Sequence, residues 1–186
     1  MHHEPMHFIY ETKTLYSELF IGKRWLEIGS GNCFPKAKSH SKDCEWVGVD
    51  IEKGDGVDVV SLGHLYKNNQ QFDAVCAFEV FEHDPYFDLT VTNMIEHLKP
   101  GGLFMMTCAY LGRKEHGTSR SHPVAMPFTQ EMDRWKDFYR NRTPGDFRSI
   151  PMFKELINGY WVINEMSKDL YMEEKTTSYN SEKAAK

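Results

Sequence analysis

The stretch Arg24-Trp25-Leu26-Glu27-Ile28-Gly29-Ser30-Gly31-Asn32-Cys33 decides the fold of this 186-residue chain. It reads as an apolar strand that carries an acid near its end and runs into a glycine-rich turn. The glycines at 29 and 31 allow positive φ and a close approach of the backbone to a ligand. A second strand, 46–50, ends in another acid, Asp50. Two such strands favour a parallel sheet with a ligand at its carboxyl edge.

Asp50 follows the glycine turn by about 20 residues, the position from which an acid can bind the ribose hydroxyls of an adenosine-containing ligand. Two cofactor classes share this geometry. A dinucleotide fingerprint needs glycine or alanine at position 34, where this chain has Phe34. Glu27 would also be unfavourable beside a pyrophosphate, whereas it suits the cationic methionine end of S-adenosylmethionine. We therefore expect S-adenosylmethionine to bind and nicotinamide dinucleotides not to bind.

Two later segments extend this pattern: residues 72–83 (FDAVCAFEVFEH) and 97–104 (HLKPGGLF). Together with the first two strands they resemble class I S-adenosylmethionine-dependent methyltransferases, from about residue 25 to residue 107. In these terms the segments are the fourth strand with its following loop and the turn into the fifth strand.

The resemblance implies a role for each motif position. Glu27 would contact the methionine amino group, Asp50 the ribose, and Ile51 the adenine, while Phe78 or Glu79 would flank the methionine part. The full set of implied cofactor-binding residues is Glu27, Gly29, Gly31, Asp50, Ile51, Leu62, Gly63, Phe78 and Glu79.

The chain departs from the family pattern at two places. Cys33 replaces the third glycine of the first loop, which alters the expected fit around the cofactor carboxylate. After the third strand, 61–64 lacks the Gly-Asp-Ala that often binds the adenine amino group. We expect backbone groups and apolar packing from Leu62 to hold the adenine instead.

The expected fold is α/β and Rossmann-like: a doubly wound, mostly parallel seven-stranded sheet with an antiparallel closing hairpin. The strands are expected at 25–28, 45–50, 57–60, 72–78, 103–109, 160–163 and 169–172. Helices are expected at about 7–20, 34–39, 85–97, 128–139 and 144–150, the last beginning at the N-cap Thr143.

The length fits one methyltransferase domain, residues 1–177, with a substrate-recognition insert at about 110–150 and a polar tail, 178–186, expected to be disordered. The net charge of −5 and the scattered basic residues argue against a nucleic-acid acceptor. No apolar run approaches the ~18 residues of a membrane span. Four cysteines without paired zinc spacing are expected to be reduced thiols, which favours the cytoplasm, or a host cytoplasm for a viral protein.

A hydroxyl acceptor must lose its proton during methyl transfer, so a general base or a Lewis-acid metal is expected. His83, just beyond the fourth strand, is the first candidate base, and activity would then fall as the pH drops through about 6.5. The alternative is that His83 only holds the loop. Asp84 could orient His83 or bind the hydroxyl. His116 and His122 lie in the insert, where they serve either catalysis or an ordinary solvated loop.

No metal site is predicted. His2, His3 and His7 lie near Glu4 at the start of the chain but without fixed spacing. A divalent metal held by Asp84 and insert residues remains possible, although no sequence spacing demonstrates it.

The insert combines polar groups with aromatic residues, which suits a carbohydrate, and its expected acceptor-binding residues are Arg113, Arg120, Trp135 and Tyr139. Its pattern resembles small methyltransferases encoded near glycan-building genes in bacteria and large viruses. The resemblance implies O-methylation of a sugar hydroxyl on a glycan. The alternatives are methylation of an oxygen or nitrogen of a small metabolite, and a non-catalytic subunit that binds S-adenosylmethionine.

Overall fold

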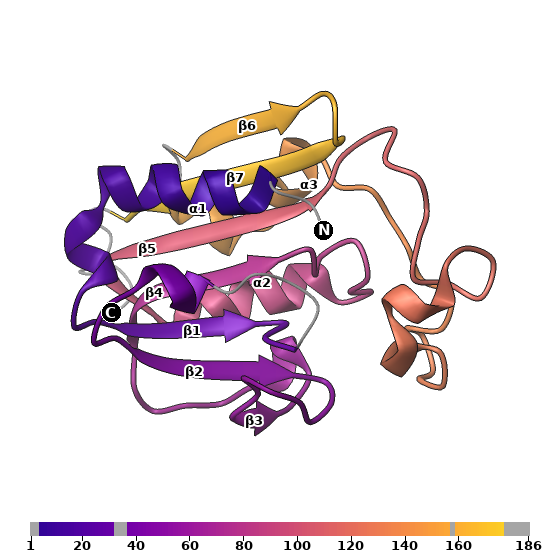
Figure 1. Cartoon of the computed structure of the whole chain (residues 1–186), viewed down its shortest axis with the longest axis horizontal. Coiled ribbons are helices and arrows are strands. Elements are labelled where there is room, and N and C mark those ends of the chain that lie inside the picture. Colours follow the sequence, from indigo (N-terminus) through magenta and orange to yellow (C-terminus); the bar gives the residue numbers. More distant parts are fainter. Residues whose placement is uncertain (1–3, 32–36, 157–158, 177–186) are drawn as a thin grey trace.

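A computed structural model describes residues 4–31, 37–156 and 159–176. Seven strands form one sheet in the order β3-β2-β1-β4-β5-β7-β6 (Figure 1). The first five run parallel, and β7 is antiparallel to both β5 and β6. The predicted fold class, including the closing hairpin, is therefore confirmed. The strands are β1 (Arg24–Ile28), β2 (Glu45–Asp50), β3 (Val59–Val60), β4 (Phe72–Phe78), β5 (Leu98–Ala109), β6 (Tyr160–Asn164) and β7 (Asp169–Lys175).

Helices cover both faces of the sheet. The α-helices in the described residues are α1 (Glu4–Leu15), α2 (Phe87–Glu96) and α3 (Pro144–Arg148). Single-turn 3-10 helices make up the rest: η1 (Ser17–Phe20), η2 (Ala37–His40), η3 (Gly63–Leu65), η4 (Pro123–Ala125), η5 (Pro127–Thr129) and η6 (Met152–Glu155). In Figure 1, α1 lies in front of the sheet and α2 behind it.

The alternation of side chains along each strand produces two apolar cores. In β4, Ala74 and Cys76 point to the α1 face, while Val75 and Ala77 point to the α2 face. All four are fully buried, as expected for central strands of a parallel sheet covered on both sides. Because neither face of β4 is exposed, its apolar run is continuous in the sequence.

Phe147 joins α3 to the core behind the sheet. It is fully buried, and its ring lies 5.6–5.7 Å from the rings of Phe81, Phe87, Phe153 and Trp161. A capping box at Thr143 and Asp146 begins the helix, as the sequence predicts for Thr143-Pro144.

The predicted helix at 128–139 is wrong. This segment contains the 3-10 turn η5 followed by turns, and Arg134 and Asp137 adopt positive φ values of 68° and 60°. Two residues in the left-handed region interrupt a right-handed helix, and the segment instead follows the loop after β4, where Trp135 packs on Tyr86 and Tyr139 packs on His83.

The other elements differ less from the predicted boundaries. The third strand is shorter than predicted, and the fifth begins at Leu98 instead of residue 103. Of the predicted helix at 34–39, the described residues form the 3-10 helix η2. Phe34, Cys33 and the tail 178–186 lie outside the described residues.

β1 and β4 are neighbours at the centre of the sheet. The strands that follow β1 in the sequence, β2 and β3, lie on one side of this pair, and those that follow β4 lie on the other side, so the strand order reverses between β1 and β4. Open α/β sheets bind ligands at this switch point, beyond the carboxyl ends of the strands. Figure 1 shows the insert from β5 to α3 projecting past that same edge. Within the described part of the chain, no helix combines the length and the apolar character needed to cross a membrane.

Replacing Phe147 by Ala should lower the free energy of unfolding by about 3–5 kcal/mol, because the cavity would lie among four aromatic rings. Tyr10→Ala is the matched control, since Tyr10 is 60% exposed on α1. Urea denaturation measures both. A loss below about 1 kcal/mol for Phe147→Ala would contradict its role in anchoring α3.

Candidate active site

A cleft with a cavity volume of about 210 Å³ opens at the switch point. The loops after β1, β2, β3 and β4 form its base, and insert residues close one side. Its lining residues are Ile28, Gly29, Gly31, Val49, Asp50, Ile51, Glu52, Lys53, Gly54, Ser61, Leu62, Gly63, Phe78, Glu79, Val80, His83, Asp84, Met126, Phe128, Thr129 and Trp135.

The turn after β1 requires its glycines. Gly29 has a φ of +78°, and a Cβ there would collide with Cγ2 of Val80. A Cβ on Gly31 would lie 2.8 Å from Oδ2 of Asp50. Both glycines therefore keep the backbone bare where a ligand can approach it.

Asp50 links the first two loops of the cleft. Its Oδ2 accepts a hydrogen bond of 2.7 Å from the Gly31 nitrogen, and its Oδ1 accepts one of 2.7 Å from the Ile51 nitrogen. Each carboxylate oxygen has a further lone pair. The side chain is thus held in place while it can still accept hydrogen bonds from a ribose.

The loop after β3, which lines the cleft with Leu62 and Gly63, packs on α2. A Cβ on Gly63 would lie 2.7 Å from Cγ2 of Thr90, and the Gly63 carbonyl accepts a hydrogen bond from Asn93. Leu62, Gly63 and Ile51 all line the cleft.

Glu79 and Glu27 differ in position. Glu79 lines the cleft at the end of β4 with a φ of +54°, and its Oε1 accepts a hydrogen bond of 2.7 Å from Thr107. Burial and the Asp169 charge raise the pKa of Glu79 to about 7. Glu27 is buried but is not among the lining residues, and its charge adds to the effect of burial in raising the pKa of the Cys76 thiol.

The loop after β4 is held by a buried arginine that the sequence did not single out. Arg142 is 1% exposed, and its guanidinium donates hydrogen bonds of 2.9 Å to the carbonyls of Phe81 and Asp84. The guanidinium carbon also lies 3.7 Å from the centre of the Phe87 ring. The insert and the loop of residues 81–84 are therefore one rigid unit.

His83 points toward the insert as well as the cleft. Its Nε2 lies 3.3 Å from Nε2 of His116, and the Tyr139 ring packs against both imidazoles. Burial, followed by the proximity of His116, lowers the pKa of His83 to about 3. The expectation that activity falls as His83 titrates near pH 6.5 is therefore corrected, because the imidazole is already neutral there.

Glu82 is a second residue that sequence reasoning missed. It is fully buried beside His83, and neither carboxylate oxygen has a hydrogen-bond partner of good geometry. Burial and the nearby Glu79 carboxylate hold the pKa of Glu82 well above its usual range. The adjacent Glu-His pair in the sequence was a signal that could have drawn attention to it.

Asp84 and Trp135 line the cleft on the side of the insert, and the rings of Tyr86 and His64 pack next to them. Asp84 Oδ1 accepts a hydrogen bond from the Tyr86 nitrogen, and Oδ2 accepts one from Thr90. Burial raises the pKa of Asp84. The Tyr86 ring lies 4.6 Å from that of His64 and 5.1 Å from that of Trp135.

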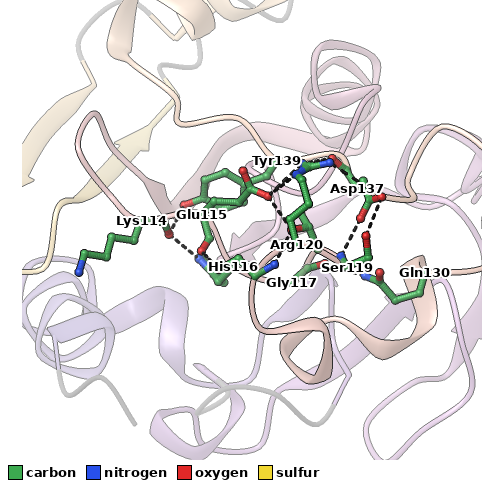
Figure 2. A network of polar contacts seen from close by, with 11 residues as sticks. Lys114, Glu115, His116, Gly117, Ser119, Arg120, Gln130, Asp137 and Tyr139 are labelled. Carbon is green, nitrogen blue, oxygen red and sulfur yellow. Dashed lines mark hydrogen bonds and ion pairs between the residues drawn. The ribbon is translucent and has the colours of Figure 1, made fainter.

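The two predicted acceptor-binding arginines lie elsewhere. The Arg113 Nη1 pairs with buried Asp169 at 3.0 Å and also donates to the Ser167 carbonyl, so this side chain ties the insert to the closing hairpin. Arg120 pairs with Glu115 and Asp137 within the insert (Figure 2). Neither arginine lines the cleft.

Of the other predicted residues in the insert, Trp135 lines the cleft and His116 lies against His83. Tyr139 packs on the two histidines and donates a hydrogen bond to the Lys114 carbonyl. His122 is exposed, with a φ of +55°, and does not line the cleft. The structure thus brings His83, His116 and Asp84 together but not His122.

The chain matches the family described as a methyltransferase domain over residues 3–147. It belongs to this family. The enzyme is an S-adenosylmethionine-dependent methyltransferase, as the sequence predicts. No curated protein matches its sequence.

Similar solved structures include 1,6-didemethyltoxoflavin-N1-methyltransferase from Burkholderia thailandensis, with bound 1,6-didemethyltoxoflavin and S-adenosylhomocysteine. Its TM-score is 0.60 at 13% identity, over 91% of this chain and 78% of that chain. The N-methyltransferase NodS from Bradyrhizobium japonicum, in complex with S-adenosylhomocysteine, has a TM-score of 0.53 at 14% identity, over 90% of this chain and 86% of that chain. At these identities the likeness shows a shared fold.

Asp50→Ala should weaken S-adenosylmethionine binding by roughly 1.5–3 kcal/mol, the range for hydrogen bonds to a charged group. Glu45→Ala is the matched control, because Glu45 begins the same strand and pairs with Arg24 far from the cleft. Isothermal calorimetry with S-adenosylmethionine and with NAD measures both variants. Tight NAD binding, or equal cofactor affinity in the two variants, would refute this role for Asp50.

Arg142→Leu should lower the free energy of unfolding by about 2–4 kcal/mol, because two buried carbonyls lose their charged donor. Arg140→Leu is the control, since Arg140 is 60% exposed and pairs with Asp146 at the surface. Thermal and urea denaturation measure the difference. Equal stability of the two variants would show that Arg142 does not hold the loop.

Proposed function

We propose that this methyltransferase transfers a methyl group to a hydroxyl of a sugar on a glycan. The observation that carries the proposal is that Trp135 and the Asp84 carboxylate both line the cleft, with the rings of Tyr86 and His64 packed next to Trp135. Aromatic faces suit the apolar face of a sugar ring, and a carboxylate suits its hydroxyls.

The cofactor half of the cleft fits S-adenosylmethionine. We assign the ribose to Asp50, the adenine to Ile51, Leu62 and Gly63, and the methionine end to the turn at Gly29 and Gly31. The bare backbone at both glycines and the lone pairs left on Asp50 support this assignment. When bound, the cofactor supplies an electrophilic methyl group on a sulfonium. Glu27, Phe78 and Glu79 stay proposed contacts of the methionine end.

In the acceptor half, we assign roles to Trp135, Asp84 and His83. Trp135 orients the acceptor and excludes water from one side of it, and Tyr86 holds the Trp135 ring by packing against it. Asp84 accepts a hydrogen bond from an acceptor hydroxyl through the lone pairs not used by Tyr86 and Thr90. His83 presents a neutral imidazole at the same edge.

Arg113, Arg120 and Tyr139 contribute to the acceptor site by holding the insert. Arg120 crosses from Glu115 to Asp137, and Asp137 accepts two hydrogen bonds from Ser119 (Figure 2). This network fixes the loop that carries His116. Acceptor recognition then rests on the residues that face the cleft.

A small-metabolite acceptor is the second candidate. The buried carboxylates of Glu79 and Asp84 line the same cleft and would favour a cationic amine as well as a hydroxyl. The net charge of −5 opposes a nucleic-acid acceptor.

We place the reaction in the cytoplasm. Cys44, Cys76 and Cys108 are free thiols, and the last two are buried. Free thiols of this kind are usual in a reducing compartment.

Transfer of a labelled methyl group from S-adenosylmethionine tests the acceptor class. Glycans, small amines and phenols, and proteins are offered in parallel, and mass spectrometry locates the label. We expect label on a sugar oxygen. Label only on nitrogen would support the second candidate and overturn the sugar proposal.

With an acceptor in hand, Trp135→Ala should raise its KM about 10-fold, while the cofactor Kd changes less than about twofold. Trp135→Phe is the conservative control and should keep most of the affinity, since it retains an aromatic face. If the acceptor KM stayed unchanged in Trp135→Ala, Trp135 would not bind the acceptor.

A further inference from the structure

The insert and the loop after β4 bring three metal-ligating side chains together. Glu82, His83 and His116 offer ligand atoms that all lie within 4.8 Å of one another. Among the residues that the structure describes, they form the only such group of three. Glu82 and His83 are buried, while His116 is partly exposed and leaves a path for an ion to enter.

The separation of the two imidazoles matches a shared ion. Their Nε2 atoms are 3.3 Å apart. Two nitrogens bound to one tetrahedral zinc ion at about 2.0–2.1 Å lie about 3.3–3.4 Å from each other. A hydrogen bond between two neutral imidazoles explains the same distance, so the third residue of the group decides between the two.

Glu82 is the member of the group that favours a cation. Its carboxylate is fully buried, and neither oxygen has a hydrogen-bond partner of good geometry. A buried polar group without a partner is rare in proteins and costly, and an ion is one of the few things that can satisfy it. Glu82 lies near a second carboxylate, that of Glu79, which brings no positive charge, whereas an ion bound by all three residues would satisfy the Glu82 oxygens.

The surroundings also resemble a metal site. Nδ1 of His116 lies 3.2 Å from the Lys114 carbonyl, and a hydrogen bond there would fix the orientation of the ring with Nε2 toward an ion. The network of Glu115, Arg120 and Asp137 holds this part of the insert (Figure 2). Arg142 fixes the loop that carries Glu82 and His83 through the Phe81 and Asp84 carbonyls.

We propose that Glu82, His83 and His116 bind one divalent transition-metal ion, with zinc as the best match, at the insert side of the cofactor cleft. Two imidazoles and one carboxylate suit zinc, which keeps a fourth position for an outside oxygen in such sites. Magnesium is a poorer match because it prefers oxygen ligands. The carboxylate closes on the ion by a side-chain movement.

The use of the ion rests on the proposed function. His83 lines the cleft, so an ion that it holds would lie beside the acceptor half. A cation there would bind an acceptor hydroxyl and lower its pKa. His83 would then be a ligand of the metal and not itself the base.

Metal content tests the site without any acceptor. His2, His3 and His7 are first replaced by Ala, so that histidines near the start of the chain do not bind zinc. The full-length protein is loaded with Zn²⁺, desalted, and analysed by mass spectrometry of the metal. We expect about one zinc per chain. Cobalt loaded in place of zinc should give the visible absorption of a four-coordinate ion.

In the same background, His116→Ala and Glu82→Gln should each lower zinc affinity by at least about 100-fold in competition with a chelating indicator. His122→Asn is the matched control and should keep the affinity, because His122 lies in the same insert outside the group, and Asn tolerates its positive φ. Circular dichroism checks that each variant is folded. Since Glu82 is buried and its variant can fail to fold, His116→Ala decides the outcome in that case.

No zinc retained by the parent protein, or equal affinity in His116→Ala and His122→Asn, would overturn the site. Calorimetry with S-adenosylmethionine on the same samples keeps this outcome separate from the proposed function. A protein that retains no zinc but binds the cofactor and transfers methyl groups would refute the metal site and leave the methyltransferase function in place.

Discussion

The hydrogen bonds from the buried Arg142 to the Phe81 and Asp84 carbonyls are the constraint on which the acceptor half of this enzyme depends. They join the insert to the loop after β4. Without Arg142, the carbonyls of Phe81 and Asp84 in that loop would lose this hydrogen-bond donor. Because a guanidinium presents its donors in a fixed fork, it sets both the distance and the orientation of the two segments. His83 and Asp84 thereby reach the edge of the cleft in fixed positions.

The two halves of the cleft are built in different ways. The cofactor half comes from short loops that follow adjacent parallel strands, and a single carboxylate, Asp50, connects two of them. The acceptor half is assembled from the loop after β4 and from a long insert without regular helices, held by ion pairs and aromatic contacts (Figure 2). Such a division allows acceptor specificity to change while the cofactor site is retained.

Sequence reasoning succeeded where local pattern and tertiary environment agree. The strands around Trp25, Asp50 and Phe78 have continuous apolar runs because both faces of the sheet are covered. The capping box at Thr143 is equally local. It failed in the segment 128–139, where aromatic side chains at helical spacing pack on separate partners and the backbone turns through positive φ at two positions.

By itself, the sequence determined the fold class, the glycine turn and the acid that ends β2, because these features depend on residues that are near one another along the chain or repeat with the strand. Only the tertiary structure decided that Arg113 and Arg120 serve the scaffold, that Glu82 lies buried beside His83, and that His116 but not His122 meets that pair. The contact of Arg113 with Asp169 joins residues 56 apart in the sequence, and that of His83 with His116 joins residues 33 apart. Their formation depends on how the insert folds back onto the sheet, which no local pattern encodes.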